Sequence, residues 1–139
     1  MGTIADNILA LSDGLPPHVS VVAVSKTRSI NEILEAYEAG QRIFGENKVQ
    51  ELLSKAGSLP GDIRWHLIGH LQTNKVKHVV TVASMIESVD SLRLLSLIND
   101  EAIKHGKITE CLLQVHIASE ETKFGFDMAE ISDTDWRSV

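Results

Sequence analysis

Five short apolar segments, each joined to the next by a segment with helical spacing, constrain the fold of this 139-residue sequence more than any other feature. The apolar segments lie at residues 18–26, 42–46, 65–69, 85–89 and 111–117. Helices are predicted over residues 3–13, 29–39, 47–56, 73–83 and 91–105. Such alternation is typical of parallel strands that are joined by right-handed helical crossovers. The sequence therefore predicts an α/β fold.

Two parallel architectures fit this pattern, an open doubly wound sheet and a TIM-type (β/α)8 barrel. A complete barrel takes about 250 residues. Five strands in 139 residues match the density of the N-terminal portion, about five β/α units, of such a barrel. The first segment, HVSVVAVSK at residues 18–26, is a continuous β-branched run, which predicts a strand covered on both faces. The helix behind it begins with a capping box, formed by Ser29 and Glu32.

Composition excludes several classes of function. The net charge is −6 and the basic residues are scattered, which argues against a nucleic-acid partner. The single cysteine, Cys111, excludes an internal disulfide framework and fits a reducing compartment. The N-terminus lacks the features of a signal peptide, and no segment approaches the run of about 20 apolar residues that spans a membrane. A soluble, cytoplasmic protein is expected.

Polar residues follow each predicted strand, at the edge of a parallel sheet where ligands bind. The candidate binding residues are Lys26, Asn47, His70, Ser88 and Lys123. They mix amine, carboxamide, imidazole and hydroxyl groups, without clustered carboxylates or closely spaced His and Cys, so a metal site is not expected.

Lys26 has two interpretations. A neutral lysine amine at a strand end adds to a carbonyl and forms a Schiff base. Alternatively, its stem covers apolar surface while the ammonium stays in water. Asn47 is equally well explained as the cap of the helix behind it, and His70 as an ordinary exposed loop residue. His66, within the third strand, is interpreted as a structural histidine.

Four motifs in the sequence occur together in one known family. They are AVSKTRS, AGQRIFGENKVQE, WHLIGHLQTNK and EETKFGF, in this order. In order and spacing they closely resemble the pyridoxal-phosphate homeostasis proteins, small proteins that bind pyridoxal 5′-phosphate (PLP) and are related to the barrel domain of alanine racemase. The resemblance extends over residues 19–126.

The resemblance implies that Lys26 holds PLP as a Schiff base and that the protein serves intracellular vitamin B6 and amino-acid homeostasis without a defined turnover. It makes Asn47 a candidate lining residue and places Lys123 near the phenolic oxygen of the cofactor. PLP-dependent enzymes are the implied partners. Residues 1–139 then form a single PLP-binding domain that stops before barrel closure, because family members continue through further strands that hold the phosphate. The open barrel edges predict self-association.

Other functions remain as alternatives. In a PLP-dependent amino-acid racemase, Lys26 would be one proton-transfer base and a second base would face it. No tyrosine stands at a strand end to supply that base, because the only one, Tyr37, lies within a predicted helix. Two further alternatives are a class I aldolase and an interaction module that binds no cofactor.

Overall fold

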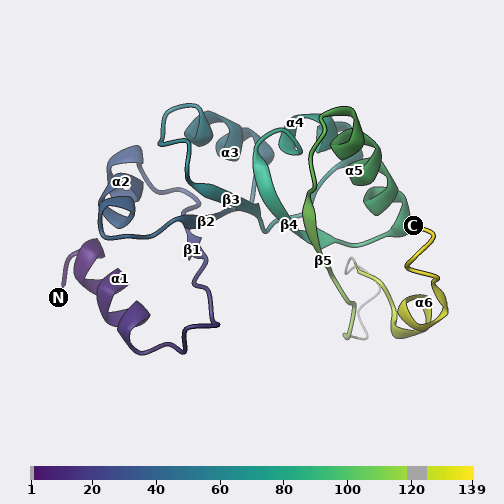
Figure 1. Cartoon of the computed structure of the whole chain (residues 1–139), viewed down its shortest axis with the longest axis horizontal. Helices are drawn as coiled ribbons and strands as arrows, with labels where there is room; N and C mark the ends of the chain where they lie inside the picture. Colours follow the sequence, from purple (N-terminus) through teal and green to yellow (C-terminus); the bar gives the residue numbers. More distant parts are fainter. Residues whose placement is uncertain (1, 119–124) are drawn as a thin grey trace.

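The computed structural model describes residues 2–118 and 125–139, which form one curved sheet with helices packed along it (Figure 1). The helices are α1 (Ile4–Asp13), α2 (Ile30–Glu38), α3 (Val49–Ala56), α4 (Val76–Val79), α5 (Leu92–Lys104) and α6 (Met128–Asp133), with a 3-10 turn at Thr73–Lys75. The strands are β1 (Ala23–Val24), β2 (Ile43–Glu46), β3 (Arg64–Leu67), β4 (Ala83–Val89) and β5 (Glu110–Leu113).

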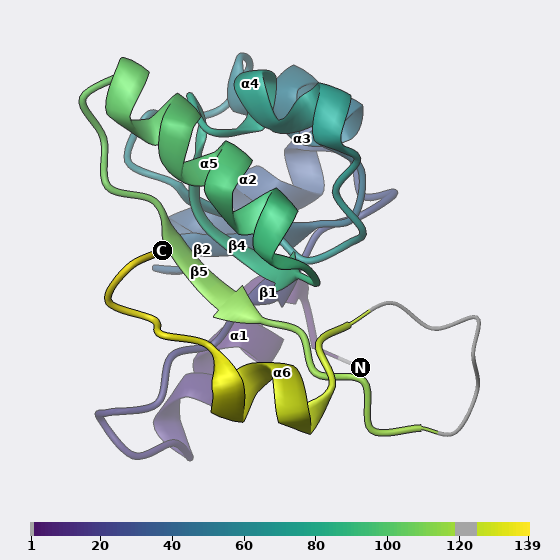
Figure 2. The ribbon, with the colours of Figure 1, turned by 90° about the vertical axis from the view of Figure 1, so that its right-hand side faces the viewer.

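The order of the strands distinguishes between the two predicted architectures. All neighbouring strands are parallel, and they lie in the sequence order β1-β2-β3-β4-β5. A doubly wound sheet reverses its strand order at a switch point, whereas a barrel adds each strand beside the previous one. Helices α2 to α5 lie on the same side of the curved sheet (Figure 2). The sheet is therefore of the barrel type, as the sequence predicts.

The core lies between the sheet and these helices. Alternate strand residues such as Phe44, Trp65 and Ile86 are buried there, and the rings of Phe44 and Trp65 are 5.9 Å apart. The predicted capping box at the start of α2 is confirmed, since Ser29 accepts from the N–H of Glu32 and the Glu32 carboxylate accepts from Ser29. The core therefore forms on the helix side and leaves the opposite face of the sheet without crossover helices.

The first strand differs from its prediction. Strand β1 contains only Ala23 and Val24, because only these two residues are in register with β2, opposite Phe44 and Gly45. The expectation of cover on both faces is wrong, since Val24 is 53% exposed on the side away from the helices. A β-branched run encodes extended backbone, but it does not specify how many partners surround the strand.

Two other boundaries differ from the predictions. The helix expected over 73–83 is reduced to the turn Thr73–Lys75 and α4, and the chain then enters β4 at Ala83. Four successive residues of low helix propensity, Val79 to Val82, favour this early end. Strand β5 stops at Leu113 rather than at residue 117, and Val115 instead forms an isolated parallel bridge with Phe126.

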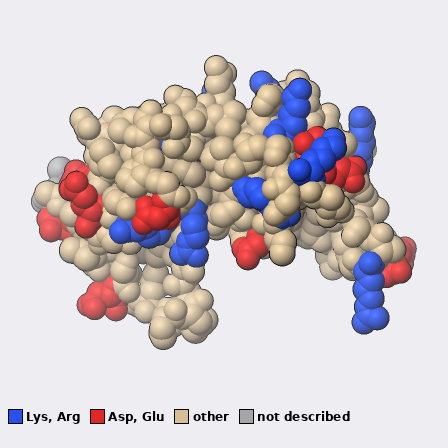
Figure 3. All heavy atoms as spheres, turned by 45° about the horizontal axis from the view of Figure 1, so that its top comes forward, with Lys and Arg blue, Asp and Glu red and all other residues tan. Residues whose placement is uncertain are grey.

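Charged side chains of both signs are interspersed over the surface drawn in Figure 3, with lysines and arginines in small separate groups. This arrangement agrees with the scattered basic residues in the sequence. Among the helices of the described ranges, none has both the length and the apolar character that crossing a bilayer requires.

Candidate functional site

Lys26 lies immediately beyond β1, at the carboxyl edge of the sheet. The preceding residue, Ser25, is buried and extends the ladder by donating its N–H to the carbonyl of Gly45 at 2.9 Å. Because successive side chains alternate between faces of a strand, Lys26 lies on the opposite face from Ser25, where it is exposed. Within the described ranges, no side chain forms a hydrogen bond or ion pair with the Lys26 ammonium, so its nitrogen is accessible to a ligand.

The other predicted residues are spread along the same edge. Asn47 follows β2 and is half-buried, and it does not cap α3, because Lys48 occupies the cap position without a side-chain hydrogen bond. Ser88 is buried and donates its hydroxyl hydrogen to the Gly69 carbonyl at 2.6 Å. Lys123 lies outside the described residues.

His70 lines a hollow of its own at the ends of β3 and β4. Its Nδ1 is 3.3 Å from a carboxylate oxygen of Asp90, and its side chain is 46% exposed. The hollow has a volume of about 550 Å³ and is also bordered by Ser91 and Gly125. Lys26 does not line this hollow, so the strand-end residues do not converge on a single cavity of the described structure.

The ends of β2 and β3 approach each other closely at Gly69. A Cβ atom on Gly69 would lie 2.3 Å from the carbonyl oxygen of Asn47 and 2.8 Å from its Cα. Only glycine permits this approach of two backbones. Sequence reasoning treated Gly69 as the end of a strand and missed that it places Asn47.

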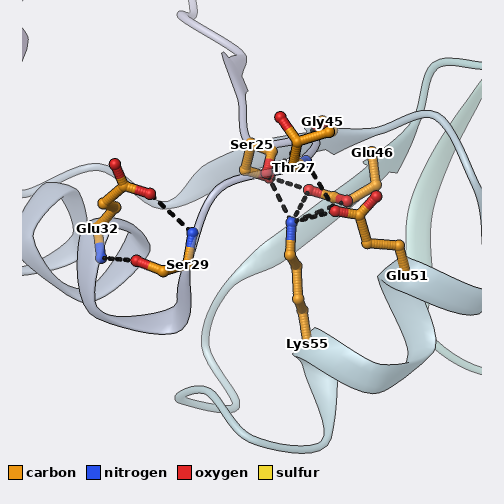
Figure 4. A network of polar contacts seen from close by, with 8 residues as sticks. All are labelled: Ser25, Thr27, Ser29, Glu32, Gly45, Glu46, Glu51 and Lys55. Atoms are coloured by element: carbon orange, nitrogen blue, oxygen red, sulfur yellow. Dashed lines mark hydrogen bonds and ion pairs between the residues drawn. The ribbon is translucent and has the colours of Figure 1, made fainter.

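A buried polar network contacts Ser25 and Thr27, the two residues that flank Lys26 (Figure 4). The Lys55 ammonium donates to the Ser25 carbonyl at 2.6 Å and lies 3.0 Å from a carboxylate oxygen of Glu46. It also donates to Glu51 at 2.7 Å. The side chains of Lys55 and Glu46 are 8% and 0% exposed, so both charges are removed from water. The Ser25 hydroxyl donates to the same Glu46 carboxylate.

The network also reaches the residue that follows Lys26. Glu51 Oε2 accepts the backbone N–H of Thr27 at 2.8 Å. Its hydrogen bond with the Lys55 ammonium, and then the one with the Thr27 N–H, hold the pKa of Glu51 below its ordinary value. Thr27 has φ of 63°, the left-handed region that a β-branched residue rarely adopts. Sequence analysis missed Lys55; the only signal for it was its position one turn after Glu51, beside the buried Leu52.

Two further polar pairs test earlier interpretations. His66 is 8% exposed and its Nδ1 lies 2.7 Å from Glu87 Oε1, so this histidine is satisfied by a partner, as expected. Tyr37 donates its hydroxyl hydrogen to Asp62 at 2.6 Å, and this bond raises the pKa of the phenol. The Tyr37 hydroxyl is therefore engaged by the loop before β3, at the amino end of that strand rather than at the carboxyl edge where Lys26 lies.

A family model described as "Alanine racemase, N-terminal domain" matches residues 1–135 of the chain. The chain is 41% identical over 119 residues to the pyridoxal phosphate homeostasis protein of Synechocystis sp., covering 84% of this chain and 55% of that protein. It is also 41% identical over 119 residues to the human protein of the same name, covering 79% and 43%. The chain thus spans about half the length of these relatives.

Solved structures agree with this similarity. The structure of PipY from Synechococcus elongatus with PLP bound superimposes with a TM-score of 0.85 at 39% identity, covering 94% of this chain and 63% of PipY. PipY without PLP gives a TM-score of 0.88 at 40% identity, covering 93% and 61%. Alanine racemase from E. faecalis, at 12% identity and a TM-score of 0.70, covers 88% of this chain and 34% of the racemase and shares the fold alone.

Proposed function

The chain belongs to the alanine racemase N-terminal domain family, and from this membership we propose that it binds PLP as a Schiff base on Lys26. The single observation that carries the proposal is the exposed amine of Lys26 at the end of β1, which has no partner among the described residues, in a fold shared with PLP-bound PipY. PLP supplies an aldehyde. When the Lys26 nitrogen adds to the aldehyde carbon, a C=N bond replaces the C=O bond and one water molecule leaves.

We propose that its biological role is the one for which the relatives are named, the homeostasis of PLP. This role includes the homeostasis of vitamin B6 and amino acids within the cell. Asn47, His70 and Ser88 are proposed to border the cofactor from the ends of the next strands, and Lys123 to lie near its phenolic oxygen. Residues 1–139 are proposed to belong to a single PLP-binding barrel domain.

Lys26 as the attachment site predicts a specific labelling result. We expect borohydride reduction of the full-length protein with PLP, followed by peptide mapping, to place the adduct on Lys26. Lys26→Ala should lose this adduct, whereas the exposed-lysine control Lys77→Ala should keep it. Labelling spread evenly over surface lysines, or undiminished in Lys26→Ala, would refute the attachment site.

We propose a carrier rather than the alternative racemase. A racemase needs a second base opposite Lys26, and the phenol of Tyr37, the only tyrosine of residues 1–139, is bonded to Asp62 in the loop before β3. We therefore expect PLP-loaded full-length protein to exchange the α-hydrogen of L-alanine with deuterated solvent far below enzymatic rates. Exchange with inversion at about 1 to 1,000 per second would instead establish a racemase.

The proposed partners and location follow from the same role. PLP-dependent enzymes inside the cytoplasm are the proposed recipients of the cofactor, and the scattered charge gives no support to a nucleic-acid partner. For residues 1–139 alone, self-association is proposed through β1 and β5, each of which pairs with only one neighbour among the described strands. Unpaired strand edges readily add a further strand.

A further inference from the structure

We propose that Lys55 and Glu51 of α3 are positioning residues, which fix the backbone on both sides of Lys26 and so set the place of its amine. The proposal rests on the proposed attachment of PLP to Lys26. It goes beyond that attachment because both residues bond to the main chain of Ser25 and Thr27, the neighbours of Lys26 (Figure 4).

On the N-terminal side of Lys26, Lys55 holds the Ser25 carbonyl. The three hydrogens of its ammonium are matched by three groups, which are the Ser25 carbonyl at 2.6 Å, Glu51 at 2.7 Å and Glu46 at 3.0 Å. Because the Lys55 side chain is only 8% exposed, water cannot readily replace these partners. The last residue before Lys26 is therefore anchored to α3 by a charge-assisted bond.

On the C-terminal side of Lys26, Glu51 holds the Thr27 N–H at 2.8 Å. The left-handed conformation of Thr27, with φ of 63°, is unfavourable for a β-branched residue and persists only where its surroundings impose it. Glu51 is itself held in place by the Lys55 ammonium. The two α3 side chains thus act as one unit that maintains the bend directly after Lys26.

These contacts explain how the backbone of an exposed lysine is fixed before its ligand binds. The Lys26 side chain has no hydrogen bond or ion pair of its own within the described ranges, so the position of its amine depends on the direction in which the backbone presents it. A reacting group that is fixed before binding loses less conformational freedom when the bond forms. Loss of the hydrogen bonds that hold Ser25 and Thr27 should therefore lower the affinity with which Lys26 binds PLP as a Schiff base.

The test uses Glu51→Ala in the full-length protein, because Glu51 is 27% exposed and its removal leaves the buried Lys55–Glu46 pair intact. PLP is titrated against each variant and the visible absorbance of the Schiff base gives the apparent Kd. We expect Glu51→Ala to bind PLP about tenfold more weakly, the factor for one hydrogen bond to a charged group. Glu51→Gln, whose amide oxygen can still accept the Thr27 N–H, should recover most of the affinity.

Two further variants separate positioning from a general loss of structure. Thr27→Gly in the Glu51→Ala background should restore binding, because glycine adopts positive φ without the cost that Glu51 offsets. Glu101→Ala, which removes a helical ion pair with the exposed Lys104 on α5, should leave the Kd unchanged.

Different failures point to different conclusions. Wild-type affinity in Glu51→Ala, or a loss that neither Glu51→Gln nor Thr27→Gly reverses, would overturn the positioning role while leaving the attachment site in place. A wild-type protein that forms no Schiff base on Lys26 would refute the proposed function, and the positioning role with it.

Discussion

Lys55→Met is expected to lower the free energy of unfolding by about 3–5 kcal/mol, the usual cost of removing one partner from a buried ion pair. The methionine keeps most of the side-chain volume but leaves the Glu46 carboxylate, which is 0% exposed, without its cation. The Ser25 carbonyl also loses its 2.6 Å donor. The expected loss is a large fraction of the total stability of an ordinary domain.

Urea unfolding of the full-length protein, followed by the fluorescence of the buried Trp65 and by circular dichroism, measures this effect. Lys77→Met is the control, since this exposed lysine should change stability by less than about 0.5 kcal/mol. Adding Glu46→Gln to Lys55→Met should recover part of the loss, because the uncompensated charge is removed. A loss in Lys55→Met no larger than that of the control would contradict a buried ion pair.

Gly69→Ala is expected to destabilise the protein by about 1–3 kcal/mol and to weaken PLP binding. The added methyl group would lie 2.3 Å from the Asn47 carbonyl oxygen, and that contact is with backbone rather than with a flexible side chain. The Ile68 N–H donates to the Glu46 carbonyl at 2.9 Å beside the contact, so the two strand ends cannot separate without breaking the ladder. Asn47 would therefore be displaced from the carboxyl edge of the sheet.

Gly61→Ala is a matched control for this prediction. A Cβ atom at Gly61 meets nothing within 4 Å, so the same glycine-to-alanine change should alter the free energy of unfolding by less than about 0.5 kcal/mol. Thermal unfolding and a PLP titration of both variants distinguish the two glycines. Equal stability of Gly69→Ala and Gly61→Ala would show that β2 and β3 do not approach as closely as described.

The sequence by itself predicted the order of the elements and the accessible lysine. Local patterns encode these features: the capping box of Ser29 and Glu32 begins α2, and alternating strand and helix segments require parallel strands with crossovers. The placement of Lys26 after an apolar strand follows from the same local pattern. These features can be predicted without knowing which distant residues pair.

Only the tertiary structure determined how many residues of each predicted strand form that strand. The β-branched run that contains β1 encodes extended backbone, but only Ala23 and Val24 are in register with residues of β2. Likewise, β5 ends at Leu113, the last of its residues that pairs with β4. Strand partners are contacts between distant segments, and residue spacing does not reveal them.

The contacts that hold the residues on either side of Lys26 also depend on tertiary structure. Lys55 looks like one more exposed helical lysine in the sequence, yet the packing of α3 against the sheet buries it against Glu46, nine residues earlier, and Ser25, thirty residues earlier. The positive φ of Thr27 and the close approach of Gly69 to Asn47 arise in the same way. Local propensity determined the position of Lys26 at the end of an apolar strand. The long-range packing of α3, β2 and β3 determined which residues hold its backbone, because burial and charge pairing exist only once distant segments meet.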